Sequence, residues 1–208
     1  MKKSKRVKKS NSWKIKQHRD QFFKKSKTLG YRSRASFKLI ELNKKFKFIK
    51  KNCHLLDLGS YPGGWSQVAR KNIISGKMLS IDIKPMKPIP NVKFLKSDIF
   101  KEETKATVKK YFLNKIDVIL SDMAADTTGS KSLDSIRTNQ LCAEVINFST
   151  KILKPKGVLV SKVFMGEDFI EVKNLAQASF EQVNFFKPES SRSESKETYL
   201  HCKILKTL

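Results

Sequence analysis

The chain has 208 residues, with 44 Lys or Arg against 19 Asp or Glu, and a formal net charge of +25 at pH 7. This length allows one α/β domain with a full core and is too short for two ordinary domains. No run of about 18 apolar residues occurs, so we expect neither a membrane span nor a secretory signal. The cysteines are isolated and histidines are few, which predicts no metal site, no disulfide and a reducing cytoplasm.

The positive charge gathers in the first quarter of the chain. Residues 1–52 contain 20 Lys or Arg and 2 acids, whereas residues 53–208 contain 24 and 17. Such clustering indicates a polyanion partner, because cations near phosphates release condensed counterions. Only 7 of the 44 basic residues are Arg, which a genome poor in G and C would also explain. That bias does not explain the clustering, so we expect nucleic acid.

The first 52 residues predict an arm and two helices. Residues 1–12 are basic and without periodicity, as in a disordered arm, and residues 13–27 predict a short basic helix. A second helix is expected after Ser33, which can cap it. Lys38 lies at the border of its apolar stripe, which consists of Leu39, Leu42, Phe46 and Ile49. We interpret residues 13–52 as a basic helical extension.

After this extension, short strands alternate with helices through residues 53–208. The expected strands are 53–58, 77–81, 92–95, 116–121, 157–163, 182–186 and about 196–205. The expected helices lie near 65–72, 102–112, 133–153 and 167–180. Strands separated by helices predict a parallel sheet. The last two strands have only a short polar connection, which requires an antiparallel pair. We therefore expect an α/β fold with a seven-stranded, mostly parallel sheet, a reversed last strand and helices on both faces.

The most informative segment is residues 54–66, HLLDLGSYPGGWS, a strand followed by a glycine-rich loop and a helix start. Nucleotide-like ligands bind at this point of open α/β sheets, where glycines let the backbone approach them. The loop lacks the G-x-G-x-x-G spacing that binds pyrophosphate, so a nucleoside without phosphates is the better expectation. S-adenosylmethionine is the commonest ligand of that kind. Gly63 and Gly64 would lie against the methionine end of the cofactor. Trp65 would pack at the helix start, where a core position is the commoner role.

Two further carboxylates follow the second and third strands. Asp82 lies about 20 residues past the glycine loop, where it could accept from the ribose hydroxyls of a nucleoside. A turn aspartate before Lys84 is the alternative. Asp98 could accept from an adenine amino group, or it could cap the helix that follows.

Two charged residues stand at the ends of later strands. The strand 116–121 is followed by Asp122, and Lys162 interrupts an apolar run in the strand 157–163. Because burying an unpaired ammonium is costly, Lys162 requires partners or a lowered pKa. A structural ion pair and a catalytic group are equally compatible with its position.

The stretch 55–67, LLDLGSYPGGWSQ, resembles the first motif of the FtsJ family of RNA 2′-O-ribose methyltransferases. The resemblance extends from Trp13 to about Ile204 and implies the Rossmann-like class I S-adenosylmethionine-dependent methyltransferase fold. The family binds this cofactor through residues matching Gly63, Trp65, Asp82, Asp98 and Asp122. It carries out methyl transfer with a Lys-Asp-Lys-Glu tetrad, which is matched here by Lys38, Asp122, Lys162 and Glu197. This chain departs from the family at Tyr61 and at Ala125-Asp126.

The resemblance implies methylation of a uridine ribose in 23S ribosomal RNA of the large subunit. We also expect a monomer, and no metal, because methyl transfer leaves no phosphate charge to neutralise. We expect Lys162 to be the general base, and Lys38 and Glu197 to orient the ribose and the base. Lowering a lysine pKa from ~10.4 to ~7.5 requires about 4 kcal/mol. The carboxylates oppose that shift, whereas Lys38 and the sulfonium charge of the cofactor favour it. We therefore expect cofactor binding to help deprotonate Lys162.

Other functions remain compatible with parts of the pattern. The tetrad is shared with enzymes that methylate tRNA or mRNA caps, but the chain has no room for a cap-binding domain. The match around Arg32-Ser33-Arg34-Ala35 and residues 192–199 favours the ribosomal type. A catalytically silent ribosome-assembly factor would be favoured by loss of a tetrad residue, and none is lost. A nicotinamide-dependent oxidoreductase is opposed by the glycine spacing and the reversed strand.

Overall fold

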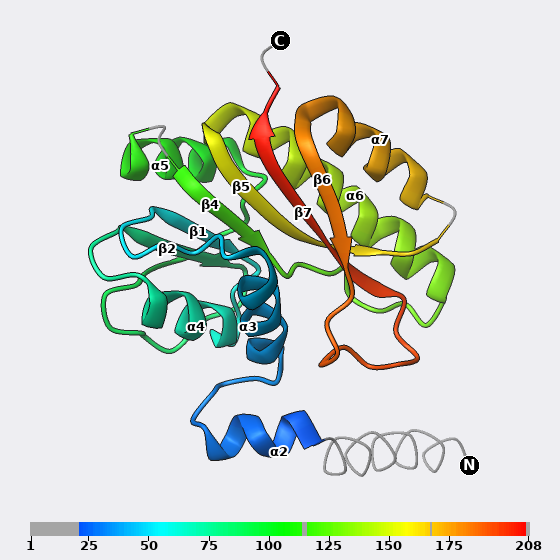
Figure 1. Cartoon of the computed structure of the whole chain (residues 1–208), viewed down its shortest axis with the longest axis horizontal. Helices are drawn as coiled ribbons and strands as arrows, with labels where there is room; N and C mark the ends of the chain where they lie inside the picture. The colour runs from blue at the N-terminus through cyan, green and yellow to red at the C-terminus, as the bar shows by residue number, and fades with distance from the viewer. Residues whose placement is uncertain (1–20, 114–115, 167, 207–208) are drawn as a thin grey trace.

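The computed structural model describes residues 21–113, 116–166 and 168–206. The expected arm at residues 1–12 lies outside the described residues, as does the first part of the expected helix 13–27. The rest of that helix is α2, Gln21–Thr28. It lies beyond the edge of the main body in Figure 1. The described helices include none that is long and apolar enough to cross a membrane.

A seven-stranded sheet with the order β3-β2-β1-β4-β5-β7-β6 runs through the molecule (Figure 1). Its strands are β1 Leu55–Leu58, β2 Met78–Asp82, β3 Lys93–Lys96, β4 Ile116–Ser121, β5 Leu153–Phe164, β6 Phe180–Phe186 and β7 Glu197–Leu205. The five strands β1 to β5 pair in parallel, and β7 pairs antiparallel with both β5 and β6. The expected fold class, with one reversed strand at the end of the chain, is confirmed.

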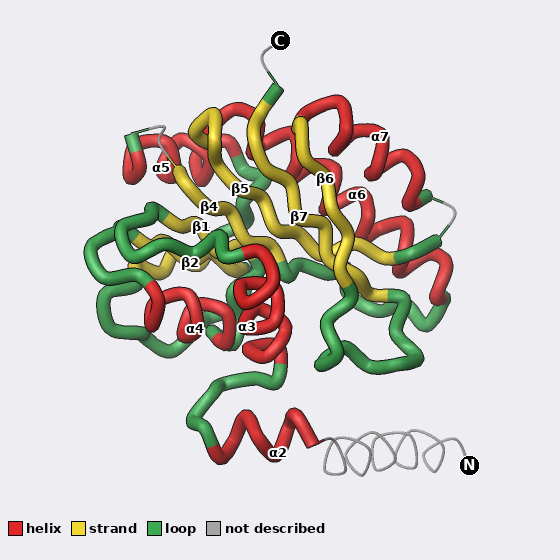
Figure 2. Tube along the Cα trace, in the orientation of Figure 1, coloured by secondary structure: helices red, strands yellow, loops and turns green. Residues whose placement is uncertain are grey.

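Helices cover both faces of this sheet, as Figure 2 shows. They are α3 Ala35–Phe46, α4 Gly64–Asn72, α5 Glu102–Phe112, α6 Lys131–Ile152 and α7 Phe169–Ser179. Apolar residues of α5, α6 and α7 share one hydrophobic core with the sheet, and those of α3 and α4 share the other. Because side chains alternate along a strand, Leu56 and Leu58 of β1 enter the first core and Leu55 enters the second.

Helix α3 differs from the expectation at both ends. Ser33 does not cap it: the helix begins at Ala35, and its N-cap residue Arg34 has helical backbone angles without a side-chain cap. The helix ends at Phe46, because Lys47 adopts a left-handed conformation with φ 52°. Ile49 is nevertheless buried with the rest of the expected stripe. Strand β5 also begins earlier than expected, directly after α6.

Leu39 and Leu42 of α3 pack in the same core as Leu55 of β1. The extension therefore contributes to the hydrophobic core that supports the sheet. The division of the chain into residues 1–12, 13–52 and 53–208 stays a prediction.

Candidate active site

Four charged side chains from distant parts of the chain meet at the carboxyl edge of the sheet. Lys38 Nζ lies 2.6 Å from Glu197 Oε1, and Lys162 Nζ lies 2.8 Å from Asp122 Oδ1. Lys162 Nζ also lies 3.7 Å from Glu197 Oε2. Lys162 therefore contacts both carboxylates, and Glu197 contacts both ammonium groups. The structure brings together all four residues of the tetrad.

Sheet register explains this convergence. Ser121 at the end of β4 pairs with Ser161 of β5, so that Asp122 and Lys162 follow side by side. Strand β7 runs in the opposite direction, and its first residue Glu197 pairs with Phe164 near the end of β5. Helix α3 packs on the face of the sheet to which Tyr199 of β7 also points, and it supplies Lys38. A parallel sheet with one reversed strand thus places three tetrad residues at a single edge.

The tetrad residues perturb one another electrostatically. Burial lowers the pKa of Lys162, but Asp122 and Glu197 together raise it by more, and the pKa ends above its ordinary value. Burial raises the pKa of Asp122, and this is outweighed by Lys162 and then Lys38, which hold the pKa below its usual range. The two carboxylates therefore compensate the buried charge of Lys162, and the lysine stays protonated within the ion pairs.

Two neighbours that the sequence did not single out orient the acids. The hydroxyl of Tyr199 donates to Asp122 Oδ1 at 2.7 Å, and the hydroxyl of Ser191 donates to Glu197 Oε1 at 2.9 Å. Tyr199 is two residues from Glu197 in one strand, so period-two alternation could have identified it. Ser191 lies in a loop, where no comparable pattern exists.

The loop between β6 and β7 is held against α3. The carboxylate of Glu41 accepts from the backbone N–H groups of Glu189 and Ser190, at 2.6 and 3.1 Å. The guanidinium of Arg34 donates to the carbonyl of Ser190. A cavity of about 200 Å³ opens beside this loop, and it is lined by Arg34, Lys38, Arg192, Ser195 and Glu197. An anionic substrate could reach the tetrad from this side.

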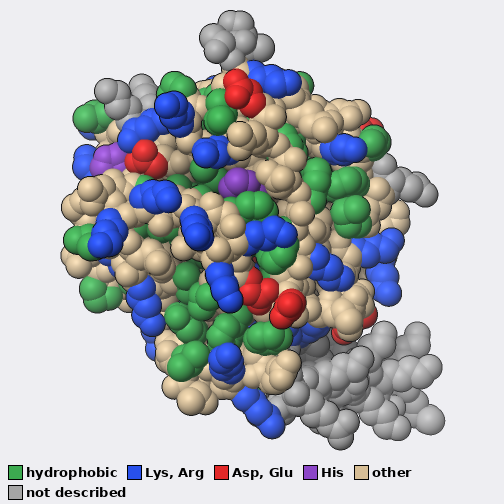
Figure 3. Space-filling model, in the orientation of Figure 1, with side chains coloured by type: hydrophobic (Ala, Val, Ile, Leu, Met, Phe, Trp, Pro, Cys, Tyr) green, Lys and Arg blue, Asp and Glu red, His purple; other side chains and the backbone are tan. Residues whose placement is uncertain are grey.

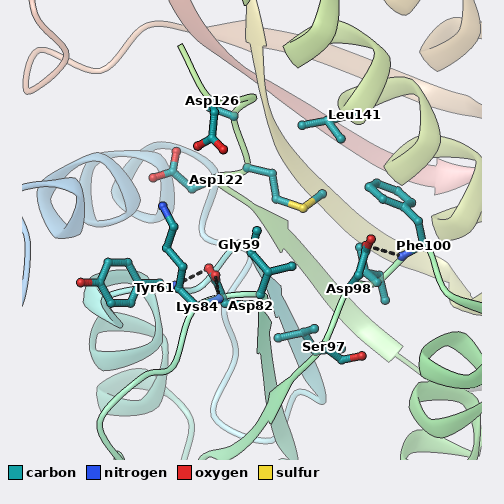
Figure 4. Close-up of a pocket in the computed structure, with 15 residues that line it drawn as sticks. Gly59, Tyr61, Asp82, Lys84, Ser97, Asp98, Phe100, Asp122, Asp126 and Leu141 are labelled. Carbon is teal, nitrogen blue, oxygen red and sulfur yellow. Dashed lines mark hydrogen bonds between the residues drawn. The ribbon is translucent and has the colours of Figure 1, made fainter. Parts of the chain in front are cut away.

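A second cavity of about 380 Å³ has Asp122 in its wall (Figure 4). Asp82 and Asp98 also line it, so three of the expected cofactor contacts share one cavity, which we call the carboxylate pocket. Asp82 accepts from the N–H groups of Tyr61 and Lys84, each at 2.8 Å. It therefore also serves as the turn aspartate considered above.

Asp98 accepts from the N–H of Phe100 at 2.9 Å, within its own turn. It is not the cap of the following helix, because the N-cap position of α5 is Lys101. Asp98, Phe100 and Leu141 lie at the same end of the carboxylate pocket (Figure 4).

The glycine loop lies beside the carboxylate pocket, but Gly63, Gly64 and Trp65 are not among the residues that line it. Gly63 has a φ of 108°, which other residues rarely adopt, and it precedes the first turn of α4. Trp65 is 3% exposed and its indole N–H donates to the carbonyl of Ala35 at 2.8 Å. The guanidinium of Arg32 donates to the carbonyl of Pro62 within the loop. These residues set the shape of the loop, and their contact with a cofactor stays a prediction.

Asp57, in β1, is fully buried beneath this loop. The hydroxyl of Ser66 donates to its Oδ2 at 2.5 Å, and Ser66 in turn contacts the hydroxyl of Ser80 at 2.9 Å. Its other oxygen, Oδ1, has no hydrogen-bond partner in the described part of the chain. Burial raises the pKa of Asp57 to about 7, and the nearby charges of Asp122 and Asp82 add to this rise. The sequence contains the residue in its first motif without indicating this role.

The reversed strand β7, the glycine loop after β1 and the carboxylate pocket together define the class of Rossmann-like methyltransferases. Within this class, the chain belongs to the FtsJ-like methyltransferase family, whose model matches residues 31–205.

Individual relatives agree with this assignment. The chain is 44% identical to the ribosomal RNA large subunit methyltransferase E of Pelagibacter ubique, over 95% of this chain and 97% of that protein. It is 43% identical to the protein of the same name from Rickettsia akari, over 94% and 89%. A Plasmodium falciparum crystal structure described as a ribosomal RNA methyltransferase superposes with a TM-score of 0.75 at 36% identity. That match covers 84% of this chain and 98% of the other.

A more distant structure shares the fold alone. Human methyltransferase-like protein 13, crystallised in complex with SAH, superposes with a TM-score of 0.58 at 15% identity. The match covers 81% of this chain and 79% of that one. The sheet and its helices are therefore common to methyltransferases of very different sequence.

Proposed function

We propose that this protein uses S-adenosylmethionine to methylate the 2′-hydroxyl of a uridine ribose in 23S ribosomal RNA of the large subunit. The observation that carries the proposal is the tetrad, in which two ammonium groups and two carboxylates meet beside the carboxylate pocket. The names of the Pelagibacter and Rickettsia relatives support the choice of RNA.

The carboxylate pocket fits a nucleoside with a cationic end. Its volume of about 380 Å³ lies in the range of small-molecule sites. Asp82 and Asp98 each keep acceptor capacity beyond their local hydrogen bonds, because a carboxylate has about four lone-pair sites. Asp122, at the end that adjoins the tetrad, offers a negative charge to a sulfonium. We assign the ribose to Asp82, the adenine to Asp98 and the reactive end to Asp122.

The cofactor supplies a methyl group on a good leaving group, so the protein's task is to align the ribose hydroxyl and to remove its proton. We assign proton removal to Lys162, and orientation of the ribose and of this base to Lys38 and Glu197. Because the carboxylates raise the pKa of Lys162, its neutral form must be favoured by other positive charges. Lys38 and the bound sulfonium are those charges.

The basic extension, residues 13–52, and the arm, residues 1–12, are assigned to RNA binding, with residues 53–208 as the methyltransferase domain. The 20 Lys or Arg of residues 1–52 support this assignment. Arg34 and Arg192 beside the tetrad suit a phosphate next to the target ribose. We propose that the protein acts as a monomer in the cytoplasm, where ribosomal subunits are available.

The test is incubation of the protein and radiolabelled S-adenosylmethionine with undermethylated large subunits, free 23S RNA and tRNA in parallel. We expect label in the large subunit or its RNA, at the 2′-oxygen of one uridine. Label in tRNA alone would overturn the choice of substrate. No label in any RNA, with cofactor binding intact, would favour the silent assembly factor.

A further inference from the structure

A cavity of about 460 Å³ opens on the sheet at the edge opposite to the tetrad. It is lined by the segment after α3, the first residues of β4 and β5, and the last residues of β7. These are the amino ends of the parallel strands, whereas the tetrad occupies their carboxyl ends. We call it the lysine cavity, because five lysines line it: Lys47, Lys50, Lys154, Lys156 and Lys203.

The charge of the lysine cavity is largely uncompensated. Asp117, the one carboxylate among the described residues that line it, pairs with Lys154 at 2.6 Å and accepts from the N–H of His54. Within the described residues, no carboxylate pairs with Lys50, Lys156 or Lys203. Like charges gathered without counterions in a concave site concentrate field lines and attract an anion.

A buried histidine borders the same cavity. His201 is 5% exposed, yet neither of its ring nitrogens has a hydrogen-bond partner among the residues that the structure describes. The ring stacks on Phe46, with centroids 4.1 Å apart and an angle of 6° between the planes. Buried polar atoms are normally satisfied, so two unsatisfied nitrogens at the wall of a cavity indicate a ligand with hydrogen-bonding groups.

The state of this histidine favours a particular ligand chemistry. Burial, and then the charge of Lys203, lower the pKa of His201 to about 4, so the ring is neutral at physiological pH. A neutral imidazole has one N–H donor and one acceptor nitrogen. A phosphate oxygen satisfies the donor and a ribose hydroxyl satisfies the acceptor, which matches the backbone of RNA.

Strand β7 connects this cavity to the tetrad along one face of the sheet. Glu197, Tyr199, His201 and Lys203 are spaced by two residues, so their side chains alternate to the same face. Six residues of strand span about 20 Å. Helix α3 lies over this face, with Lys38 beside Glu197 and Phe46 stacked on His201. Lys and Arg side chains also stand on this face in Figure 3.

We propose that the lysine cavity is a second RNA-binding site, which holds a ribose-phosphate segment of the substrate strand about 20 Å from the target ribose. The lysines contact phosphate oxygens, and His201 contacts the phosphate and a ribose hydroxyl. This inference rests on the proposed function for the identity of the RNA, but the cavity itself is separate from the tetrad.

The test compares the double variant Lys156→Glu, Lys203→Glu with the double variant Lys101→Glu, Lys110→Glu. The control pair has the same charge change on exposed positions at the ends of α5, which packs on the opposite face. Affinity for a fluorescent single-stranded RNA is measured by anisotropy over a range of salt concentrations. We expect the cavity variant to lose roughly ten-fold or more in affinity. Its slope of log affinity against log salt should fall by about 1.4, or 0.7 for each lost phosphate contact.

A second measurement follows the ring nitrogens of His201 by NMR, with the variant His201→Gln to assign its signals. We expect RNA to shift these signals, and inorganic phosphate to shift them only at much higher concentration. If inorganic phosphate shifts them as effectively as RNA does, the cavity is a free-phosphate site instead. Equal RNA affinity and slope in the two double variants would overturn the proposal.

These outcomes are separable from the proposed function. If the cavity variant loses RNA affinity relative to its control while the wild type transfers no methyl group, the proposed second RNA-binding site is supported and the proposed methyl transfer is wrong. If methyl transfer is normal and the cavity variant binds like its control, the reaction stands and the second site does not.

Discussion

Lys162 is held between two carboxylates, and this environment opposes the proton loss that a general base requires. Because its pKa is raised, the ammonium form dominates at low pH and the amine form grows as pH rises. We therefore expect the single-turnover rate to increase about ten-fold per pH unit below that pKa. Lys162→Met should lower the rate by roughly 10²–10⁴-fold and remove this pH dependence.

The matched control for this prediction is Lys105→Met, which removes an ion-paired lysine from α5 on the opposite face. It should leave both the rate and its pH dependence unchanged. An unaltered pH profile in Lys162→Met would show that another group accepts the proton.

Asp57 provides a prediction about stability rather than activity. Its pKa is about 7 in the folded protein and about 3.9 in an unfolded chain, so the folded state binds more protons between these values. Its contribution therefore destabilises the fold progressively as pH rises from about 4 to 7. The side chain of Asp57→Asn cannot ionise. Its free energy of unfolding, relative to that of the wild type, should therefore rise by on the order of 2 kcal/mol as pH increases from 5.5 to about 7.

Urea unfolding of the wild type and Asp57→Asn at these two pH values measures the change. Comparing the two proteins cancels the titration of the other carboxylates. A constant difference in unfolding free energy would mean that Asp57 is ionised throughout this range.

Some residues of the site could be predicted from their type and sequence context, whereas their contacts with one another depend on the three-dimensional fold. A lysine within an apolar strand indicated a special role for Lys162, because burial of a charge requires compensation. The 2.6 Å pair between Lys38 and Glu197 joins a helix to a strand 159 residues later, and no local pattern specifies that contact. The unsatisfied nitrogens of His201 are likewise a property of packing and not of sequence.

At the scale of elements, period and connection length predicted the sheet well. The alternation of strands and helices correctly predicted parallel pairing, and the short connection between β6 and β7 correctly predicted the reversed strand. Helix ends were less predictable, because they depend on competing local bonds. At the start of α3, the carbonyl of Ser33 accepts from the N–H of Ser36, so its backbone rather than its side chain takes part in the first turn.

The contact between α3 and α4 depends on the absence of a side chain at Gly64. A Cβ at this position would lie 2.3 Å from Ser33 Oγ and 2.7 Å from Ser36 Oγ. We expect Gly64→Ala to destabilise the protein by about 1–3 kcal/mol, as overpacking does, measured by urea unfolding. Because α3 carries Lys38, methyl transfer should fall as well.

Removal of the nearer hydroxyl supplies the control. Ser33→Ala alone should change stability little, since the Ser33 hydroxyl makes no hydrogen bond within the described residues, and Gly64→Ala with Ser33→Ala should recover part of the loss. If the double variant is no more stable than Gly64→Ala, the clash does not explain the effect.

At the scale of the whole molecule, charge is distributed as unevenly as in the sequence. Residues 1–52 have a net charge of +18 and residues 53–208 a net charge of +7. The cavity at Arg34 and Arg192 and the lysine cavity add positive groups along the face that α3 and β7 share, whereas the two ammonium groups of the tetrad are paired with two carboxylates. RNA binding should therefore be strongly salt-dependent, with each part of the basic surface contributing separately.

The arm at residues 1–12 contains six Lys or Arg and no acid. If it contacts RNA, replacing all six by Gln should weaken RNA binding and lower the slope of log affinity against log salt by at most about 4, or 0.7 for each phosphate contact. Anisotropy with single-stranded RNA and with large subunits measures both quantities. The rate at saturating RNA should stay unchanged, because the arm holds no tetrad residue. Deletion of residues 1–12 serves as the comparison: if it weakens binding but the Gln variant does not, the arm acts through its length or contacts and not through its charge.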